Sequence, residues 1–394
     1  MTQTGSLLAT GTKPNRPPEG VHQSKQNLTC VWQGLNRRRW KEIARDLPRD
    51  AKYWPRRASI AAISTMNSFY EACEHQLYGA RIARTTVEHP PIFVLGHWRS
   101  GTTLMHNLLT LDPQLTYPNL YQVMFSGHFL LTETMGAALT GWMLPKTRPM
   151  DNVPAGWKHS QEDEIALLLR TGLSPYAMLV HQGKREHYHR FFDLTELTAE
   201  ERDRWVQEFQ WFMKKLTLRS NKPIVLKSPT HTYRVPLLLE LYPNARFIYI
   251  TRNPYDVYNS TIHLRKTLFT ENALSEPCFE NLEEDTFVTY DHCIRRYEET
   301  KSLIPPGQLH ELRFEDLETD PLGEMHRVYQ ALKLPGWDAM IPRLRAQMPE
   351  HTAYQKNRFQ PDIETMQRVY DRWRYAFECY GYPHQLSGAS ERVA

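Results

Sequence analysis

The chain has 394 residues, of which 41% are hydrophobic, enough for one large α/β domain or two domains of ordinary size. Its formal net charge of +4 is too weak to indicate nucleic-acid binding, and a small anionic ligand suits it equally well. Five widely spaced cysteines without metal-ligand spacing indicate separate thiols in a reducing compartment, and exclude a disulfide framework.

The N-terminal residues Met1–Leu8 lack the long apolar region of a signal peptide, and no stretch of about twenty residues is apolar enough to span a bilayer. The nearest candidate, residues 124–144, is interrupted by His128, Glu133 and several small or polar residues. We therefore expect a soluble, cytoplasmic protein with no transmembrane segment and no nucleic-acid partner.

The first part of the chain is expected to be helical after a short tail. Residues 1–26 are polar with clustered prolines, which predicts a disordered tail. Within residues 27–88 the pattern predicts one helix over 35–47 and a second, alanine-rich helix over 56–84. This region is predicted to be either a helical cap or an arm through which the chain forms a homo-oligomer.

The next segment predicts a phosphate site. The apolar run Pro91–Leu95 predicts a buried strand, which turns through Gly96 and Gly101 into a helix over 102–111. A strand, a turn and a helix N-terminus direct free backbone N–H groups and the helix dipole at one point, where a phosphate can bind. The glycine spacing matches the Walker pattern, but Thr102 replaces its lysine and the cation is Arg99. A terminal phosphate-like group is expected here, rather than ordinary kinase chemistry.

The octet His97–Leu104 resembles the 5′-phosphosulfate-binding loop of the sulfotransferases, whose core is Pro-Lys/Arg-Ser-Gly-Thr-Thr, with Trp98 in place of the proline. The alternative is a generic glycine turn. The resemblance implies 3′-phosphoadenosine 5′-phosphosulfate (PAPS) as the sulfuryl donor and no required metal. It also implies that the donor is bound by Arg99, Ser100, Gly101, Thr102, Thr103 and Leu104.

Two segments between the loop and the second strand have competing interpretations. Residues 117–144 are rich in aromatic and large apolar side chains without clean periodicity, which predicts either an acceptor pocket or internal helix packing. The cluster Glu162-Asp163-Glu164 precedes an apolar run, a pattern that commonly matches the dipole of a helix N-terminus. Residues 188–195 are predicted to be a loop, and 198–218 a long amphipathic helix.

The α/β pattern then returns, with strands predicted over 223–227, 246–251 and 309–314 and helices over 235–241 and 254–268. Strands that alternate with helices predict a parallel sheet with ligands at the C-terminal ends of its strands. We expect a P-loop-like, three-layer α/β/α domain over residues 89–385, with helical N-terminal and lid elaborations.

Further site residues follow from the resemblance. It implies that Lys227, at the end of its strand, acts with Arg99 to stabilise charge on the departing phosphate. Arg252 and Ser260 resemble the 3′-phosphate motif, because an arginine can bind phosphate as a fork and Ser260 lies about two helical turns further on. A late basic loop that closes over the nucleotide would contain Lys356 and Arg358. Each assignment has a non-functional alternative: Lys227 as a surface lysine, Arg252 and Ser260 as solvated or capping residues, and the late loop as a solvated basic loop.

Three residues are candidates for the base that takes the acceptor proton. His231 follows the strand lysine two residues further than in the cytosolic sulfotransferases, and His159 precedes the acidic cluster. Glu164 belongs to that cluster, which resembles a feature of a bacterial sulfotransferase branch. A histidine titrates near neutral pH, whereas a glutamate needs tuning by burial. The three remain open, and each has a structural alternative.

The sequence therefore predicts a PAPS-dependent sulfotransferase that acts on a hydroxyl of a small, apolar or aromatic acceptor. One other class is a P-loop small-molecule kinase or NTPase, which would need a lysine at position 102 or nearby. The other is a catalytically inactive nucleotide-binding protein, against which the presence of Arg99, Lys227, Arg252 and Ser260 argues.

Overall fold

The computed structural model describes residues 30–145, 147, 154–353 and 362–384. The predicted tail over 1–26 and the predicted nucleotide-closing residues Lys356 and Arg358 lie outside the described residues.

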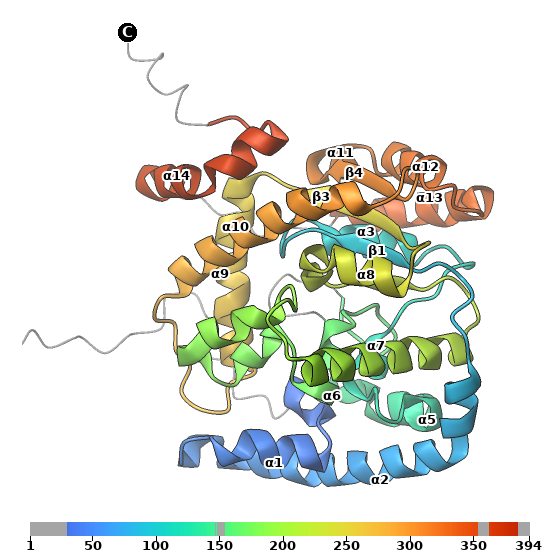
Figure 1. Ribbon diagram of the computed structural model, residues 1–394, viewed down its shortest axis with the longest axis vertical. Helices are drawn as coiled ribbons and strands as arrows, with labels where there is room; N and C mark the ends of the chain where they lie inside the picture. The colour runs from blue at the N-terminus through green and yellow to red at the C-terminus, as the bar shows by residue number, and fades with distance from the viewer. Residues whose placement is uncertain (1–29, 146, 148–153, 354–361, 385–394) are drawn as a thin grey trace, which may run out of the picture.

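A four-stranded parallel sheet forms the centre of the molecule (Figure 1). Its strands are β1 (Ile92–Leu95), β2 (Val225–Lys227), β3 (Arg246–Thr251) and β4 (Leu309–Arg313), in the spatial order β2-β1-β3-β4. β1 pairs in parallel with β2 and β3, and β3 pairs with β4. The four predicted strands and their parallel arrangement are confirmed, and all four C-terminal ends lie at one edge of the sheet.

Alternate side chains of the strands enter two different cores, because successive residues of a strand point to opposite faces. Phe93 and Phe247 face α7 (Ala199–Arg219) and α8 (Val235–Leu241). Ile92 and Ile248 face the opposite cluster, to which three helices contribute: α3 (Thr102–Leu109), α12 (Pro321–Ala331) and α13 (Trp337–Ala353). Helices cover both faces of the sheet, and the predicted three-layer architecture is confirmed.

The remaining helices surround this sandwich. α9 (Pro254–Glu271), α10 (Leu282–Thr300) and α14 (Ile363–Tyr380) pack on one another through an aromatic cluster, in which the Tyr290 and Trp373 rings stack 3.8 Å apart. α11 (Phe314–Thr319) follows β4 directly. Between β1 and β2 lie α4 (Leu120–Met124), α5 (Phe129–Thr140) and α6 (Glu164–Thr171).

The two N-terminal helices are α1 (Arg37–Arg45) and α2 (Trp54–Arg84), at the lower edge of the view in Figure 1. The Asn36 side chain caps α1 by accepting a hydrogen bond from the Arg39 amide, 3.0 Å away. α2 packs on α1, α5 and α7, and its Glu74 forms a buried ion pair with Lys215 of α7. The two predicted helices are present, and their predicted role as a cap or as an oligomer arm stays a prediction.

Some local predictions were wrong in extent or type. The helices predicted over 35–47 and 102–111 are shorter, and the one predicted over 254–268 continues to Glu271. Residues 188–195 are not a plain loop, because a 3₁₀ helix, η5 (Gln182–Phe191), includes the first four of them. Arg185 stabilises this polar segment by donating to the carbonyls of Gln182 and Cys278, contacts that the local sequence does not reveal. In the described part of the chain, no helix has the length and apolarity needed to cross a membrane.

Candidate active site

The loop between β1 and α3 has an unusual backbone that requires its glycines. Gly96 and Gly101 have φ angles of +140° and +102°, and Arg99 adopts the left-handed conformation with φ of +70°. A Cβ atom on Gly101 would lie 2.2 Å from Cδ2 of Phe314, so both the backbone angle and the space exclude a side chain. Backbone strain at a non-glycine residue such as Arg99 is typical of functional loops.

The loop ends at the N-terminus of α3, where the first helical amides have no acceptor within the helix. Thr102 is buried as the first residue of α3, and the Thr103 and Leu104 amides follow in the same turn. Ser100 differs from these residues, because its amide donates to the His97 carbonyl at 3.2 Å and its hydroxyl donates to the same oxygen at 2.8 Å. The amides of 102–104 and the helix dipole therefore give this end of the loop the geometry and partial charge that suit an anion.

Three of the predicted donor-binding residues converge beside this loop. Arg99 Nε donates to Ser260 Oγ of α9 at 2.7 Å, and Arg252 Nη1 donates to the Arg99 carbonyl at 3.1 Å. The Arg252 guanidinium lies 4.4 Å from the centre of the Phe314 ring, which supports it from one side. The ends of β1 and β3 and the first turns of α9 thus gather two arginines and a hydroxyl into one cationic site.

Lys227, the last residue of β2, makes an ion pair that the sequence did not predict. Its Nζ lies 2.6 Å from Oε1 of Glu162, and the Lys227 side chain is almost completely buried. The other oxygen of Glu162 accepts a hydrogen bond from the Tyr176 hydroxyl, which in turn accepts one of 2.9 Å from Trp98 Nε1 in the loop. Burial, followed by the neighbouring Glu162 charge, raises the pKa of Tyr176 well above its usual value, so its hydroxyl remains a donor. A chain of four polar groups therefore links the loop to the end of β2.

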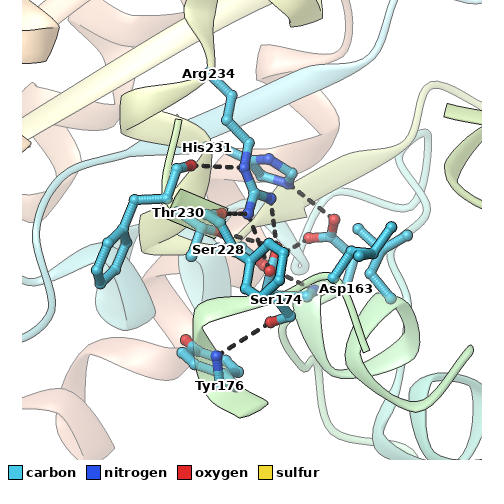
Figure 2. A network of polar contacts seen from close by, with 12 residues as sticks. Asp163, Ser174, Tyr176, Ser228, Thr230, His231 and Arg234 are labelled. Atoms are coloured by element: carbon cyan, nitrogen blue, oxygen red, sulfur yellow. Dashed lines mark hydrogen bonds and ion pairs between the residues drawn. The ribbon is translucent and has the colours of Figure 1, made fainter. Parts of the chain in front are cut away.

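The three consecutive carboxylates bind different partners at the end of β2, in η6 (Pro229–Tyr233) and directly after η6. Figure 2 shows Asp163 next to Ser228 and His231. Asp163 accepts from Ser228 Oγ at 2.8 Å and lies 2.8 Å from His231 Nε2. Glu164 accepts from Thr230 and forms a two-point ion pair with Arg234, at 2.6 and 3.1 Å. This buried network fixes the position of the start of α6 against β2, and Glu162 is the member that keeps an exposed surface.

The three predicted base candidates differ in their burial and in their hydrogen-bond partners. His231 is completely buried between the rings of Phe93 and Phe209, with its Nε2 on Asp163. Glu164 is also completely buried, and both of its oxygens face Arg234. His159 is exposed, and its backbone carbonyl accepts a hydrogen bond from the Leu120 amide at 2.9 Å. The carboxylate that forms an ion pair with Lys227 is that of Glu162.

The sequence indicates the acidic cluster Glu162-Asp163-Glu164 both as a helix start and as a source of the base, but it does not indicate which of the three carboxylates lies beside Lys227. The Glu162 side chain keeps 17% of its surface exposed, directly beside Lys227. α6 begins only at Glu164, so Glu162 precedes the helix and is free of the local geometry that the helix imposes. The signal in the sequence was the cluster itself: three consecutive carboxylates exceed what the dipole of one helix needs.

Metal ligands are not clustered in the part of the chain that the structure describes, where no group of three or more His, Cys, Asp and Glu side chains could hold an ion.

Two buried histidines beside the site predict acid sensitivity. Burial, assisted by Arg265 for His97 and by Lys227 for His106, lowers the pKa of each imidazole from 6.5 to about 3. The unfolded chain takes up these protons below about pH 6.5 and the folded chain does not, so stability is lost as the pH falls from there towards 3. We expect the free energy of unfolding to drop by about 1.4 kcal/mol per pH unit for each histidine between pH 6 and 4.

Urea unfolding at a series of pH values measures this loss, and His106→Gln should reduce its slope by about one proton. The exposed His326 provides the matched control, because His326→Gln should leave the slope unchanged. An equal slope in wild type and His106→Gln would contradict the assignment of a neutral, buried His106.

Comparisons with known proteins agree on one family. A profile of the sulfotransferase family matches residues 90–339. The chain is 35% identical over 354 residues to omega-hydroxy-beta-dihydromenaquinone-9 sulfotransferase Stf3 of Mycobacterium bovis, which covers 89% of this chain and 91% of that protein. The same protein of Mycobacterium tuberculosis gives the same values.

Solved structures agree with the fold. The sulfotransferase STF9 of Mycobacterium avium matches with a TM-score of 0.65 at 16% identity, over 89% of this chain and 91% of that chain. STF1 of Mycobacterium tuberculosis matches with a TM-score of 0.53 at 15% identity, over 88% and 93%. At such low identity these likenesses concern the architecture alone, and they support the predicted P-loop-like α/β fold.

Proposed function

The chain belongs to the sulfotransferase family, and we propose that it transfers a sulfuryl group from PAPS to a hydroxyl on a small, apolar acceptor. The observation that supports this most directly is the convergence of the Gly96–Gly101 loop with Arg99, Arg252 and Ser260. Two guanidinium groups, a hydroxyl and a helix N-terminus suit a ligand with phosphate groups at two ends.

We assign the two charged ends of PAPS, the 5′-phosphosulfate and the 3′-phosphate, to different residues of this site. The amides of Thr102, Thr103 and Leu104 would hold the 5′-phosphosulfate at the start of α3. Arg252 and Ser260 would bind the 3′-phosphate, and Arg99, which contacts both, would lie between the two ends. Lys227 and Arg99 would stabilise the negative charge that develops on the phosphate as its bond to sulfur breaks.

Glu162 is the base in this proposal, in place of His231, Glu164 or His159. The acceptor oxygen forms a bond to sulfur, the bond from sulfur to the bridging phosphate oxygen breaks, and the acceptor proton passes to a Glu162 carboxylate oxygen. Glu162 is suited to this step because it lies beside Lys227, is oriented by Tyr176 and is partly exposed. The buried His231 and Glu164 would instead position it, since their partners immobilise the segment that contains it.

The acceptor class is proposed from the relative and from the surroundings of the site. The name of Stf3 gives a hydroxylated menaquinone as what that enzyme acts on. Around Glu162 the neighbouring side chains include Trp98 and Tyr176, whose rings are 6.0 Å apart. An apolar molecule with a hydroxyl therefore suits this chain as well, and turnover of charged glycans alone in an acceptor screen would contradict this.

Binding of adenosine 3′,5′-bisphosphate, the product left by PAPS, tests the donor proposal. We expect the wild type to bind this bisphosphate in a calorimeter and to bind AMP, which lacks the 3′-phosphate, more weakly. Arg252→Ala should weaken binding of the bisphosphate by roughly ten- to a hundredfold, because it removes charge-assisted hydrogen bonds to the 3′-phosphate.

Arg246 provides a matched control, because it is the first residue of β3, whereas Arg252 directly follows the last residue of that strand. Arg246→Ala lies at the opposite edge of the sheet and should not change the affinity. Magnesium-dependent binding of ATP in preference to the bisphosphate would favour the kinase or NTPase alternative. Tight bisphosphate binding without turnover of any hydroxyl acceptor would favour the inactive binding protein.

A further inference from the structure

The outward sides of α2 and α5 expose large apolar side chains. In α5 and the following 3₁₀ turn η3 (Gly141–Met143), Met135 is 71% exposed and Trp142 is 82% exposed. We call the apolar face the exposed side chains of the middle of α2, of α5 and of η3: Met66, Phe69, Leu77, Leu131, Met135, Leu139, Trp142 and Met143. Trp54, at the start of α2, is also exposed but lies outside this set. Exposed apolar groups on this scale mark a surface that another molecule or a membrane covers.

The apolar face contains no competing charge. The structure describes every residue of α2 and α5, and no exposed position within 58–80 or 129–143 is Asp, Glu, Lys or Arg. The carboxylates in these segments point elsewhere: Glu71 pairs with Arg170, Glu74 with the buried Lys215, and Glu133 accepts from Asn119 and Gln122. Within these two segments the charged side chains that keep some exposure, Glu71 and Glu133, are therefore paired with arginines, and none of the fully exposed side chains is charged.

Cations border this face on α1. Arg37 donates to Thr65 of α2 at 3.4 Å and its amide donates to Ser68 at 2.8 Å, so α1 packs on α2 next to Met66 and Phe69 of the apolar face. Both helices lie at the bottom of the view in Figure 1. Between residues 37 and 49 the chain has six basic and two acidic residues. The exposed cations are Arg37, Arg38, Lys41, Arg45 and Arg49.

We propose that this face docks on the surface of an anionic lipid bilayer. Apolar side chains would enter the region between headgroups and acyl chains, with Trp142 at the interface and the α1 cations on the lipid phosphates. A second copy of the chain fits less well, because a two-fold contact would meet the same cationic border on both sides. The docking is peripheral, since no helix among the described residues is suited to span a bilayer.

The apolar face is connected to the candidate active site through α4. α5 packs on α4, and α4 is hydrogen-bonded to the segment that leads to Glu162, through Leu120 and the His159 carbonyl. An apolar acceptor dissolved in the bilayer would approach from this side. This last step depends on the proposed apolar acceptor, whereas the docking itself depends only on the surface.

Flotation of the full chain with vesicles tests the docking without any activity measurement. We expect it to bind vesicles that contain phosphatidylglycerol, to bind pure phosphatidylcholine less, and to be released by salt. The triple variant Met135→Ser, Leu139→Ser and Trp142→Ser should bind at least about tenfold more weakly, because it removes three of the inserted side chains. Arg38→Glu with Lys41→Glu should abolish the preference for the anionic lipid.

The matched control is Ile363→Ser, at the start of α14, because Ile363 is 71% exposed, as Met135 is, and lies on another part of the molecule. It should bind vesicles as the wild type does, and thermal melting should be unchanged in every variant. Unchanged vesicle binding in the triple variant would overturn the proposal. Absence of vesicle binding, together with a dimer in sedimentation experiments that the triple variant loses, would overturn it in favour of a second copy. Neither result bears on whether the chain binds the bisphosphate.

Discussion

Glu162→Gln is expected to lower kcat by roughly a hundred- to ten-thousandfold, the range that general-base groups contribute. Glutamine keeps the shape of the side chain and still accepts a hydrogen bond from Lys227, 2.6 Å away in the wild type, but it does not take up the acceptor proton. Steady-state kinetics with PAPS and a hydroxyl acceptor measures the loss.

A merely structural role for Glu162 would give a different result. If it only positioned Lys227, the variant would also weaken bisphosphate binding and would keep the pH profile of the wild type. A base predicts unchanged affinity for the bisphosphate, together with loss of the decline in kcat/KM on the acid side of the profile. Tyr176→Phe is the companion variant: it removes the hydroxyl that orients Glu162, so it should reduce kcat less than Glu162→Gln does. Full activity in Glu162→Gln would return the assignment to the other candidates.

The parts of the fold that the sequence predicted well depend on local patterns. A short β-branched run, two glycines and a helical apolar spacing are sufficient to predict β1, the loop and α3, because each feature is determined within a few residues. The same holds for β2 and β3 and for the proline that starts α9. Parallel strands then place Arg99, Lys227 and Arg252 at one edge, and the structure brings Arg99 and Arg252 together.

What the sequence did not predict depends on contacts between distant segments. Glu162 and Lys227 are 65 residues apart in the chain, and the same distance separates Asp163 from Ser228. Local reasoning assigns three carboxylates before an apolar run to a helix dipole, although each one satisfies a separate tertiary partner. Trp98 is a further example: it replaces the proline of the family pattern, and its indole donates to the Tyr176 hydroxyl beside Glu162.

Residues 117–144 show a second kind of limit on local reasoning. Both predicted uses, an acceptor pocket and internal packing, assume that the apolar side chains are covered. Tyr121 and Phe129 are buried in the core, as internal packing requires, whereas Met135, Leu139 and Trp142 are exposed. The segment lacked clean periodicity because α5 is apolar on both sides: one contacts the core, and the other faces outward.

Arg234→Met is expected to lower the free energy of unfolding by about 3–5 kcal/mol, because it leaves the Glu164 carboxylate buried without its partner. Arg234 and Glu164 are both almost completely inaccessible to solvent. The guanidinium also donates to the carbonyls of Phe191 and Phe192, at 2.7 and 2.8 Å, so its loss leaves two further acceptors without this donor. Urea unfolding of wild type and variant at pH 7 measures the difference.

The pair Arg202–Glu240 gives a matched control, because its side chains are 2.6 Å apart but 40% and 57% exposed. Arg202→Met should change stability by at most about 1 kcal/mol, since water already screens that pair. Adding Glu164→Gln to Arg234→Met should restore part of the lost stability, because it removes the uncompensated charge, whereas Glu164→Gln alone leaves Arg234 unpaired. Equal effects of Arg234→Met and Arg202→Met would mean that Glu164 is not held by a buried ion pair. A loss of about 3–5 kcal/mol in Arg234→Met would instead show that the Arg234–Glu164 pair fixes the start of α6 in the core. Glu162 lies two residues before Glu164, so the same pair would then help to hold Glu162 beside Lys227, in addition to the contacts that Glu162 makes itself.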